Sequence, residues 1–215
     1  MKEASTQTVA SLATFTFVTG LIDAASVLGL GHIFVANMTG NVVFIGFSLF
    51  GQGAASLHAG LLALASFLSG ALIGGRAVRH SKPNGMHAAL SLDVGLLGAA
   101  GALAAFHPSS DVHVLLALMA GAMGTRTAVV RALAVPDFTT TVLTLTLTGI
   151  AADSTLAGGQ NPRLKRRLSA VFALVAGAAS GALLISHAPR HIVLVAAALE
   201  ACATLALVHG LSKSA

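Results

Sequence analysis

The stretch VANMTGN, residues 35–41, places three hydrogen-bonding side chains, Asn37, Thr39 and Asn41, inside a strongly apolar region. It lies within the apolar run 33–51, which follows a first apolar run over 8–30. Irregular backbone at membrane depth persists only where protein or a water-filled cavity satisfies its N–H and C=O groups. The stretch therefore predicts a broken or re-entrant segment, and this sets how the rest of the chain is organised.

The chain as a whole is too apolar to fold in water. Of its 215 residues, 55% are hydrophobic and 9% are charged, whereas about a quarter are charged in a soluble domain. A membrane helix needs roughly 20 apolar residues, and runs of that order recur along the chain: 8–30, 33–51, 55–75, 88–106, 112–134, 137–156, 168–186 and 191–211. We expect an all-α integral membrane protein with a single transmembrane domain over residues 1–215.

The positions of Lys and Arg indicate how many of these runs cross the membrane. If all eight crossed, with a cytoplasmic N-terminus, six basic residues would lie inside and five outside. If 33–51 and 137–156 instead return to the side they entered from, ten are cytoplasmic, Arg190 alone is outside, and Arg126 lies within a helix. Membrane proteins show such a cytoplasmic excess. The pattern predicts six spanning helices, two re-entrant or broken segments and cytoplasmic termini, with seven or eight spans as the alternative.

Similar segments recur in the same order at offsets of 104, 105 and 107 residues. They pair Gly20 with Gly124, Thr39 with Thr144, Gly70 with Gly177, and Asp93 with Glu200. Because each half would contain three spans, the repeat predicts two inverted halves, about 1–107 and 108–215.

The second interrupted segment, 137–156, is rich in threonine where the first has asparagine. Broken segments at corresponding places in two halves indicate a binding site near the midplane in transporters. We expect the substrate-binding side chains to be Asp23, Asn37, Thr39, Asn41, Arg126, Thr140, Thr141 and Thr144.

Two of these residues are ionisable and allow more than one interpretation. Asp23 lies inside the first apolar run, where a charge costs on the order of 3 kcal/mol. It is either a proton or cation site or a hydrogen-bond acceptor for unpaired backbone of the broken segment. Arg126 could attract an anionic substrate, pair with Asp23, or extend toward the cytoplasmic interface beside Arg131. Its place late in the fifth run favours extension to the interface or structural pairing.

Asp93 and Glu200 occupy matched positions in the two halves. Inverted topology predicts that they lie toward opposite faces, with Asp93 at the cytoplasmic interface. Glu200 is deeper and is the candidate for a proton relay, although a protonated, hydrogen-bonded core Glu fits equally well.

Other patterns argue against several protein classes. The nine histidines form no H-E-x-x-H set, so we expect no metal site. The chain contains no Gly-x-Ser-x-Gly elbow, P-loop or Cys-x-x-Cys, so we expect neither an enzyme nor a bound cofactor. The basic residues lie in short loops, which does not suit nucleic acid. The pairs Gly70/Gly74 and Gly177/Gly181 suit close helix packing, within the chain or between subunits of a homo-oligomer.

Two segments carry a resemblance to a known family. GLIDAASVLGLGHIFVANMTGNVVFIGFSL (20–49) and VPDFTTTVLTLTLTGIAADS (135–154) resemble the YoaK-type family of small bacterial inner-membrane proteins. The most specific part is D-x(13)-N-M-T-G-N, from Asp23 to Asn41. The resemblance implies a multi-pass protein with about six helices and brings no established activity. Family members often have Gln-Asn where this chain has Arg126-Thr127.

These observations predict a transporter or channel of the bacterial inner membrane, surrounded by lipid and carrying a small polar solute or ion. The competing interpretation is a membrane scaffold, sensor or accessory subunit whose polar segments only lock the fold.

Overall fold

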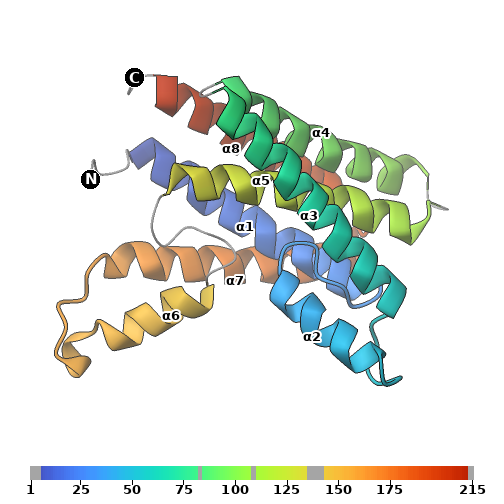
Figure 1. Ribbon diagram of the computed structural model, residues 1–215, viewed down its shortest axis with the longest axis horizontal. Coiled ribbons are helices and arrows are strands. Elements are labelled where there is room, and N and C mark those ends of the chain that lie inside the picture. The colour runs from blue at the N-terminus through green and yellow to red at the C-terminus, as the bar shows by residue number, and fades with distance from the viewer. Residues whose placement is uncertain (1–5, 82–83, 108–109, 135–142, 213–215) are drawn as a thin grey trace.

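The computed structural model describes residues 6–81, 84–107, 110–134 and 143–212, and every regular element in these ranges is helical (Figure 1). Six helices are long: α1 (Thr6–Gly29), α3 (Leu57–His80), α4 (Asn84–Phe106), α5 (Val112–Leu133), α7 (Leu164–His187) and α8 (Ile192–Ser212). Two are short, α2 (Met38–Ser48) and α6 (Leu143–Ala152), and the 3-10 turn η1 (Thr155–Ala157) follows α6. The six long helices are apolar and long enough to cross a membrane, which confirms the predicted all-α membrane fold.

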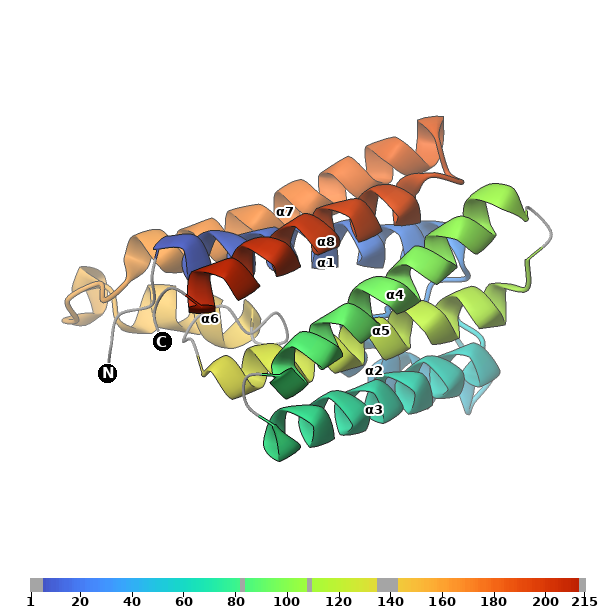
Figure 2. The same ribbon diagram turned by 90° about the horizontal axis from the view of Figure 1, so that it is seen from above.

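The two short helices do not cross the membrane. With 11 residues in α2 and 10 in α6, they extend about 16 and 15 Å, half of a hydrocarbon core of about 30 Å. The flanking helices fix their course: α1 ends where α3 begins, at one end of the bundle, and α5 ends where α7 begins, at the other (Figures 1 and 2). Each short segment therefore returns to the side it entered from, and the alternative of seven or eight spans is wrong.

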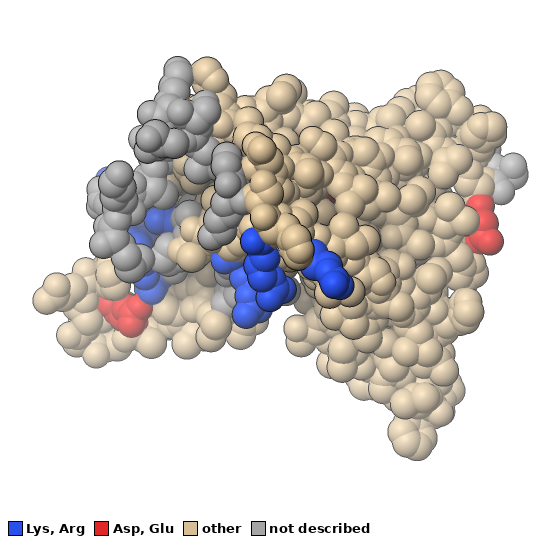
Figure 3. All heavy atoms as spheres, turned by 45° about the horizontal axis from the view of Figure 1, so that its top comes forward, with Lys and Arg blue, Asp and Glu red and all other residues tan. Residues whose placement is uncertain are grey.

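The start of α1 and the end of α8 lie at the same end of the bundle (Figures 1 and 2). That end also holds the last turns of α3 and α5 and the first turn of α7. The basic residues there are Arg76, Arg79, Arg131, Arg163, Lys165, Arg166 and Arg167, whereas Arg190 joins α7 to α8 at the opposite end. In Figure 3, the visible Lys and Arg gather in the left and central part of the face, and none is seen at the right end of the view. Lys2, Lys82 and Lys213 lie outside the described residues.

Glycine lets two pairs of helices pack closely, α1 with α7 and α3 with α5. A Cβ on Gly74 would lie 2.8 Å from the Thr125 carbonyl oxygen, and one on Gly181 would lie 2.7 Å from that of Leu21. A Cβ on Gly70 would likewise meet the backbone of α5, and one on Gly177 that of α1. Both predicted glycine pairs thus pack inside one chain, where small residues allow the close backbone approach typical of membrane helices.

Candidate functional site

A cavity of about 750 Å³ opens between α1, α2, α6 and α7. Its polar wall consists of Thr19, Asp23, Asn37, Thr39 and Thr144. Most of the remaining wall is apolar: Gly20, Ala24, Val27, Leu28, Phe34, Ala36, Gly40, Val43, Phe44, Leu143, Leu174, Ala178 and Ala182. Residues of the first turn of both short helices belong to this wall, Thr39 and Gly40 of α2 and Leu143 and Thr144 of α6, so the two short helices meet at one cavity.

Asp23 holds the backbone that leads into α2. The N–H groups of Val35 and Ala36 donate to its Oδ1 atom at 3.0 and 2.9 Å. These N–H groups precede the helix and have no partner of their own within it, so the carboxylate satisfies donors that lipid could not. Asp23 is half-buried and also lines the cavity. The structural interpretation of this residue therefore holds, and the residue also forms part of the cavity wall.

Asn41 is fixed on the other side of the same loop. Its Nδ2 donates to the Phe34 carbonyl at 2.6 Å, and its Oδ1 accepts from the Phe34 N–H at 2.9 Å. The side chain is completely buried and is absent from the cavity wall. The Asn41 amide thus forms both hydrogen bonds with the backbone of a single residue, as a neighbouring β-strand would. Its role in this structure is to hold the loop.

The remaining predicted residues divide in the same way. Asn37, at the N-cap position of α2, and Thr39 lie in the cavity wall, and Thr144 reaches it from α6. The structure thereby brings side chains from the two matched segments to one place. Thr140 and Thr141 lie outside the described residues.

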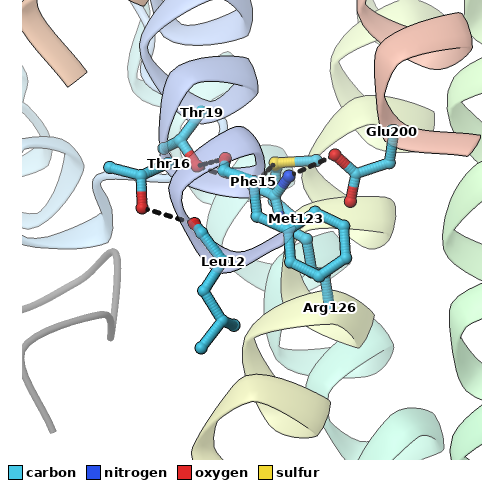
Figure 4. Close-up of polar contacts among 7 residues, drawn as sticks. All are labelled: Leu12, Phe15, Thr16, Thr19, Met123, Arg126 and Glu200. Carbon is cyan, nitrogen blue, oxygen red and sulfur yellow. Dashed lines mark hydrogen bonds and ion pairs between the residues drawn. The ribbon is translucent and has the colours of Figure 1, made fainter. Parts of the chain in front are cut away.

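Arg126 is buried in the middle of the bundle, and the expectation that it extends to the cytoplasmic interface is wrong. Only 1% of the residue is exposed. Its Nη1 donates to Glu200 Oε2 at 2.7 Å, and its Nη2 donates to Thr19 Oγ1 at 2.7 Å (Figure 4). The guanidinium also lies over the Phe15 ring, 5.6 Å from its centre. Structural pairing was the right class of interaction, with Glu200 rather than Asp23 as the partner.

Asp93 is also completely buried, so its predicted place at the cytoplasmic interface is wrong. It faces α8, where its carboxyl group lies beside that of Glu200 and interacts with the charge of Arg126. The prediction that Asp93 and Glu200 lie toward opposite faces is therefore wrong as well. Both residues are near the middle of their helices, and α4 packs along α8.

Comparison with known proteins agrees with this architecture. The sequence pattern of the family described as "Protein of unknown function (DUF1275)" matches residues 11–206. The chain belongs to this family. It is similar to the UPF0700 transmembrane protein YoaK of Bacillus subtilis (strain 168), with 33% identity over 138 residues, covering 62% of this chain and 61% of that protein. No solved structure matches. The resemblance seen in the sequence is confirmed, and the family carries no assigned activity.

Two further residues contact the cavity or the short helices in this chain, and neither is identified as a site residue by the sequence. Thr19 lines the cavity and accepts a hydrogen bond from Arg126, while its hydroxyl donates to the Phe15 carbonyl at 2.8 Å. Arg167 holds the end of α6: its Nη1 donates to the Gly149 carbonyl at 2.6 Å and pairs with Asp153 Oδ2 at 2.8 Å. Thr19 is one of several threonines in α1, and Arg167 lies in a run of basic residues. Residue type alone therefore gives no signal that either one belongs to the site.

Proposed function

We propose that this protein is a transporter or channel for a small solute, which binds in the cavity between α1, α2, α6 and α7. The observation that supports this proposal is the meeting of two interrupted membrane segments at one cavity of about 750 Å³. The six long helices are the membrane spans, and the two short helices are not among them. Residues of the first turn of each short helix lie in the cavity wall, a position where broken membrane helices bind solutes in transporters.

The wall favours a solute with a partly negative polar group and an apolar remainder. Each helix N-terminus carries a partial positive charge, and the α2 and α6 termini are joined by the Asn37 amide and the hydroxyls of Thr39 and Thr144. Phe34, Phe44 and the aliphatic residues of α1 and α7 face the other part of the cavity. A carbonyl or carboxylate oxygen at the helix ends, with carbon atoms against the rings, fits this division.

We further propose that the halves are inverted copies, as alternating access requires of many transporters. Matched glycines support this. A Cβ on Gly20 would meet the Leu174 carbonyl and the Ala178 N–H group, and one on Gly124 would meet the same groups of Phe67 and Ala71. The partner residues in α7 and α3 are themselves 107 positions apart in the sequence. The α1–α7 contact therefore corresponds to the α5–α3 contact, residue by residue.

The proposed orientation places both termini in the bacterial cytoplasm, because the basic residues cluster at that end. Single cysteines at Gln52, Asn84 and Gln160, in a Cys202→Ala chain, test it. Asn84→Cys and Gln160→Cys are expected to react with an impermeant maleimide from the cytoplasmic side, and Gln52→Cys from outside. Opposite sidedness of Asn84→Cys and Gln160→Cys would contradict the proposed topology.

The transport proposal is tested by labelling the cavity. In the Cys202→Ala chain, Thr144→Cys is expected to react with a small, water-soluble methanethiosulfonate reagent, because its side chain faces the cavity. Leu72→Cys is the control, since Leu72 is 57% exposed on the outer surface of membrane helix α3, facing lipid. Liposomes containing the Thr144→Cys chain are then tested for swelling in a panel of small carboxylates, amides and polyols.

Faster swelling for at least one solute, abolished by modification of Thr144→Cys, supports a transport site. The competing scaffold or sensor interpretation draws on the internal hydrogen bonds of Asp23 and Asn41. It predicts that no solute in the panel enters faster than in protein-free liposomes. A cavity that stays unlabelled from both sides would count against transport in the same way.

A further inference from the structure

A second polar site lies in the bundle, apart from the cavity. Asp93, Arg126 and Glu200 are 0%, 1% and 0% exposed. They come from the middle of α4, α5 and α8, between two separate clusters of buried apolar residues. The cluster toward the non-cytoplasmic end includes Leu97 and Met123, and the cluster toward the cytoplasmic end includes Leu90 and Val129. An ionisable group at this depth is costly and is usually functional.

The hydrogen bonds within this site leave acceptors without donors. Arg126 bonds to Glu200 Oε2, but Glu200 Oε1 and both carboxyl oxygens of Asp93 have no hydrogen-bond donor among the described residues. The two carboxyl groups come from packed helices, α4 and α8, and are close enough to interact electrostatically. When both are ionised they can only accept hydrogen bonds, and two adjacent buried carboxylates repel. A proton on either one turns it into a donor to the other and leaves a single negative charge opposite Arg126.

Two ionised carboxylates would face only one positive charge, that of Arg126, and no other ionisable group in the described residues supplies a second one. From α1, Asp23 interacts with Arg126 and adds a further carboxyl group. The helix α3, which also packs on α4, has its ionisable residues only near its ends, and α8 adds the exposed Cys202 and, in its last turn, His209. On α4 itself the other ionisable residue is His87, in the first turn. His87 lies six residues before Asp93, about 9 Å along the helix axis. Among the described residues, the charges that act on Asp93 are those of Glu200 and Arg126.

We propose that Asp93 and Glu200 together bind one exchangeable proton, and that this proton is coupled to the cavity through Arg126 and Thr19. The coupling, though not the proton site, rests on the proposed transport function. Binding forms one O–H bond on a carboxyl oxygen. Release returns the proton to water and leaves two carboxylates opposite one guanidinium.

Thr19 connects the two sites. Its hydroxyl oxygen accepts from Arg126 Nη2, and the same residue forms part of the cavity wall (Figure 4). When the proton leaves, the second carboxylate attracts the guanidinium away from this neutral hydroxyl, because charge-assisted hydrogen bonds are stronger than neutral ones. The wall of the cavity at Thr19 then loses its bond to the centre of the bundle, and a solute that contacts Thr19 biases the reverse step.

Infrared difference spectroscopy of the full chain in liposomes tests the proton site without any transport. The wild type is expected to show a C=O stretching band of a protonated carboxyl group that is lost as the pH is raised. Asp93→Asn and Glu200→Gln are each expected to lack the band. Asp23→Asn is the control, because Asp23 is a half-buried membrane carboxyl group outside this pair, and it is expected to keep the band. Absence of the band in the wild type, or its survival in both Asp93→Asn and Glu200→Gln, would overturn the proposal.

Asp93→Asn keeps the test valid if Glu200→Gln does not fold, because an Asn side chain still supplies an N–H donor to Glu200. The coupling is measured by the labelling rate of Thr144→Cys in the Cys202→Ala chain, with and without Asp93→Asn. The ratio of the two rates is expected to change with pH, and a constant ratio would overturn the coupling. An intact band without solute entry would refute the proposed function alone, and solute entry without the band would refute the proton site alone.

Discussion

Gly20 of α1 and Gly124 of α5 make the same contact in the two halves of the chain. A Cβ on either residue would strike the carbonyl oxygen of the facing helix, that of Leu174 for Gly20 and that of Phe67 for Gly124. Each glycine lets its helix lie directly against the backbone of its partner, which is how membrane helices associate where burial from water offers little driving force. The interfaces α1–α7 and α3–α5 therefore share a single packing solution.

Gly20→Ala and Gly124→Ala are each expected to destabilise the bundle. Alanine normally favours a helix over glycine by about 1 kcal/mol, but here the methyl group forces two backbones apart, with a penalty of about 1–3 kcal/mol or more. Thermal stability in detergent, followed by size-exclusion chromatography after heating, measures the loss. Gly98→Ala is the control, because a Cβ there meets nothing within 4 Å, and it is expected to be neutral or stabilising. Equal behaviour of all three variants would contradict the packing argument.

Arg126 and Glu200 are expected to be strongly interdependent. Removing one member of a buried ion pair leaves an uncompensated charge, which costs roughly 3–5 kcal/mol. Arg126→Met should therefore lower the thermal midpoint sharply, and Glu200→Met by less, because Asp93 still interacts with Arg126; the double variant is expected to recover part of the loss. A double-mutant cycle on thermal unfolding measures this coupling. If the two losses simply add, the 2.7 Å contact does not contribute as an ion pair.

The sequence predicted the course of the chain better than its interior. Charge distribution and apolar length are properties of whole segments, and they were sufficient to find six spans and two re-entrant helices. Which side chains meet at the centre depends on helix rotation, and the low charge content gave no periodic polar face from which to read it. Asp93 was therefore placed at the interface, although it lies beside Glu200.

The same reasoning explains which cavity residues could be predicted. Asn37, Thr39 and Thr144 stand out because polar residues interrupt an apolar run, and all three line the cavity. Asn41 belongs to the same motif, but it lies two positions beyond Thr39 on the helix and therefore points toward the Phe34 backbone. Residue type predicted the segment, whereas only the backbone path separates a cavity residue from a structural one.

Asp23→Ala is expected to loosen the loop before α2. Hydrogen bonds to a charged acceptor contribute about 1.5–3 kcal/mol each, and the substitution removes two of them, from Val35 and Ala36. Hydrogen–deuterium exchange at these two amides should accelerate by about tenfold or more. Ser26→Ala, whose hydroxyl bonds only to a carbonyl of its own helix, is the control and should leave them protected. Unchanged exchange in Asp23→Ala would show that the carboxylate does not hold this loop.

Asp111 is expected to give the N-terminus of α5 an acid-sensitive cap. Hydrogen bonds from the His113 backbone N–H and ring hold the pKa of Asp111 below its usual value of 3.8. Because the folded-state pKa is depressed, the stabilisation is complete above the unfolded-state value and is lost as the pH falls through the folded value. The difference in thermal midpoint between wild type and Asp111→Ala should thus shrink below about pH 4. For Ser56→Ala, at the uncharged cap of α3, the difference should not vary with pH.

Arg167 is expected to determine whether α6 holds its re-entrant position. Its guanidinium bonds to the Gly149 carbonyl near the end of α6 and to Asp153 just beyond it, so it satisfies a backbone acceptor and complements the negative end of the helix. Arg167→Gln cannot form both contacts, and exchange of the α6 amides should accelerate, with Thr144→Cys labelling altered at the same time. Lys165→Gln removes a positive charge from the same turn on an exposed side chain and serves as the matched control. If Lys165→Gln has the same effect, the local positive charge rather than the Arg167 contacts positions α6.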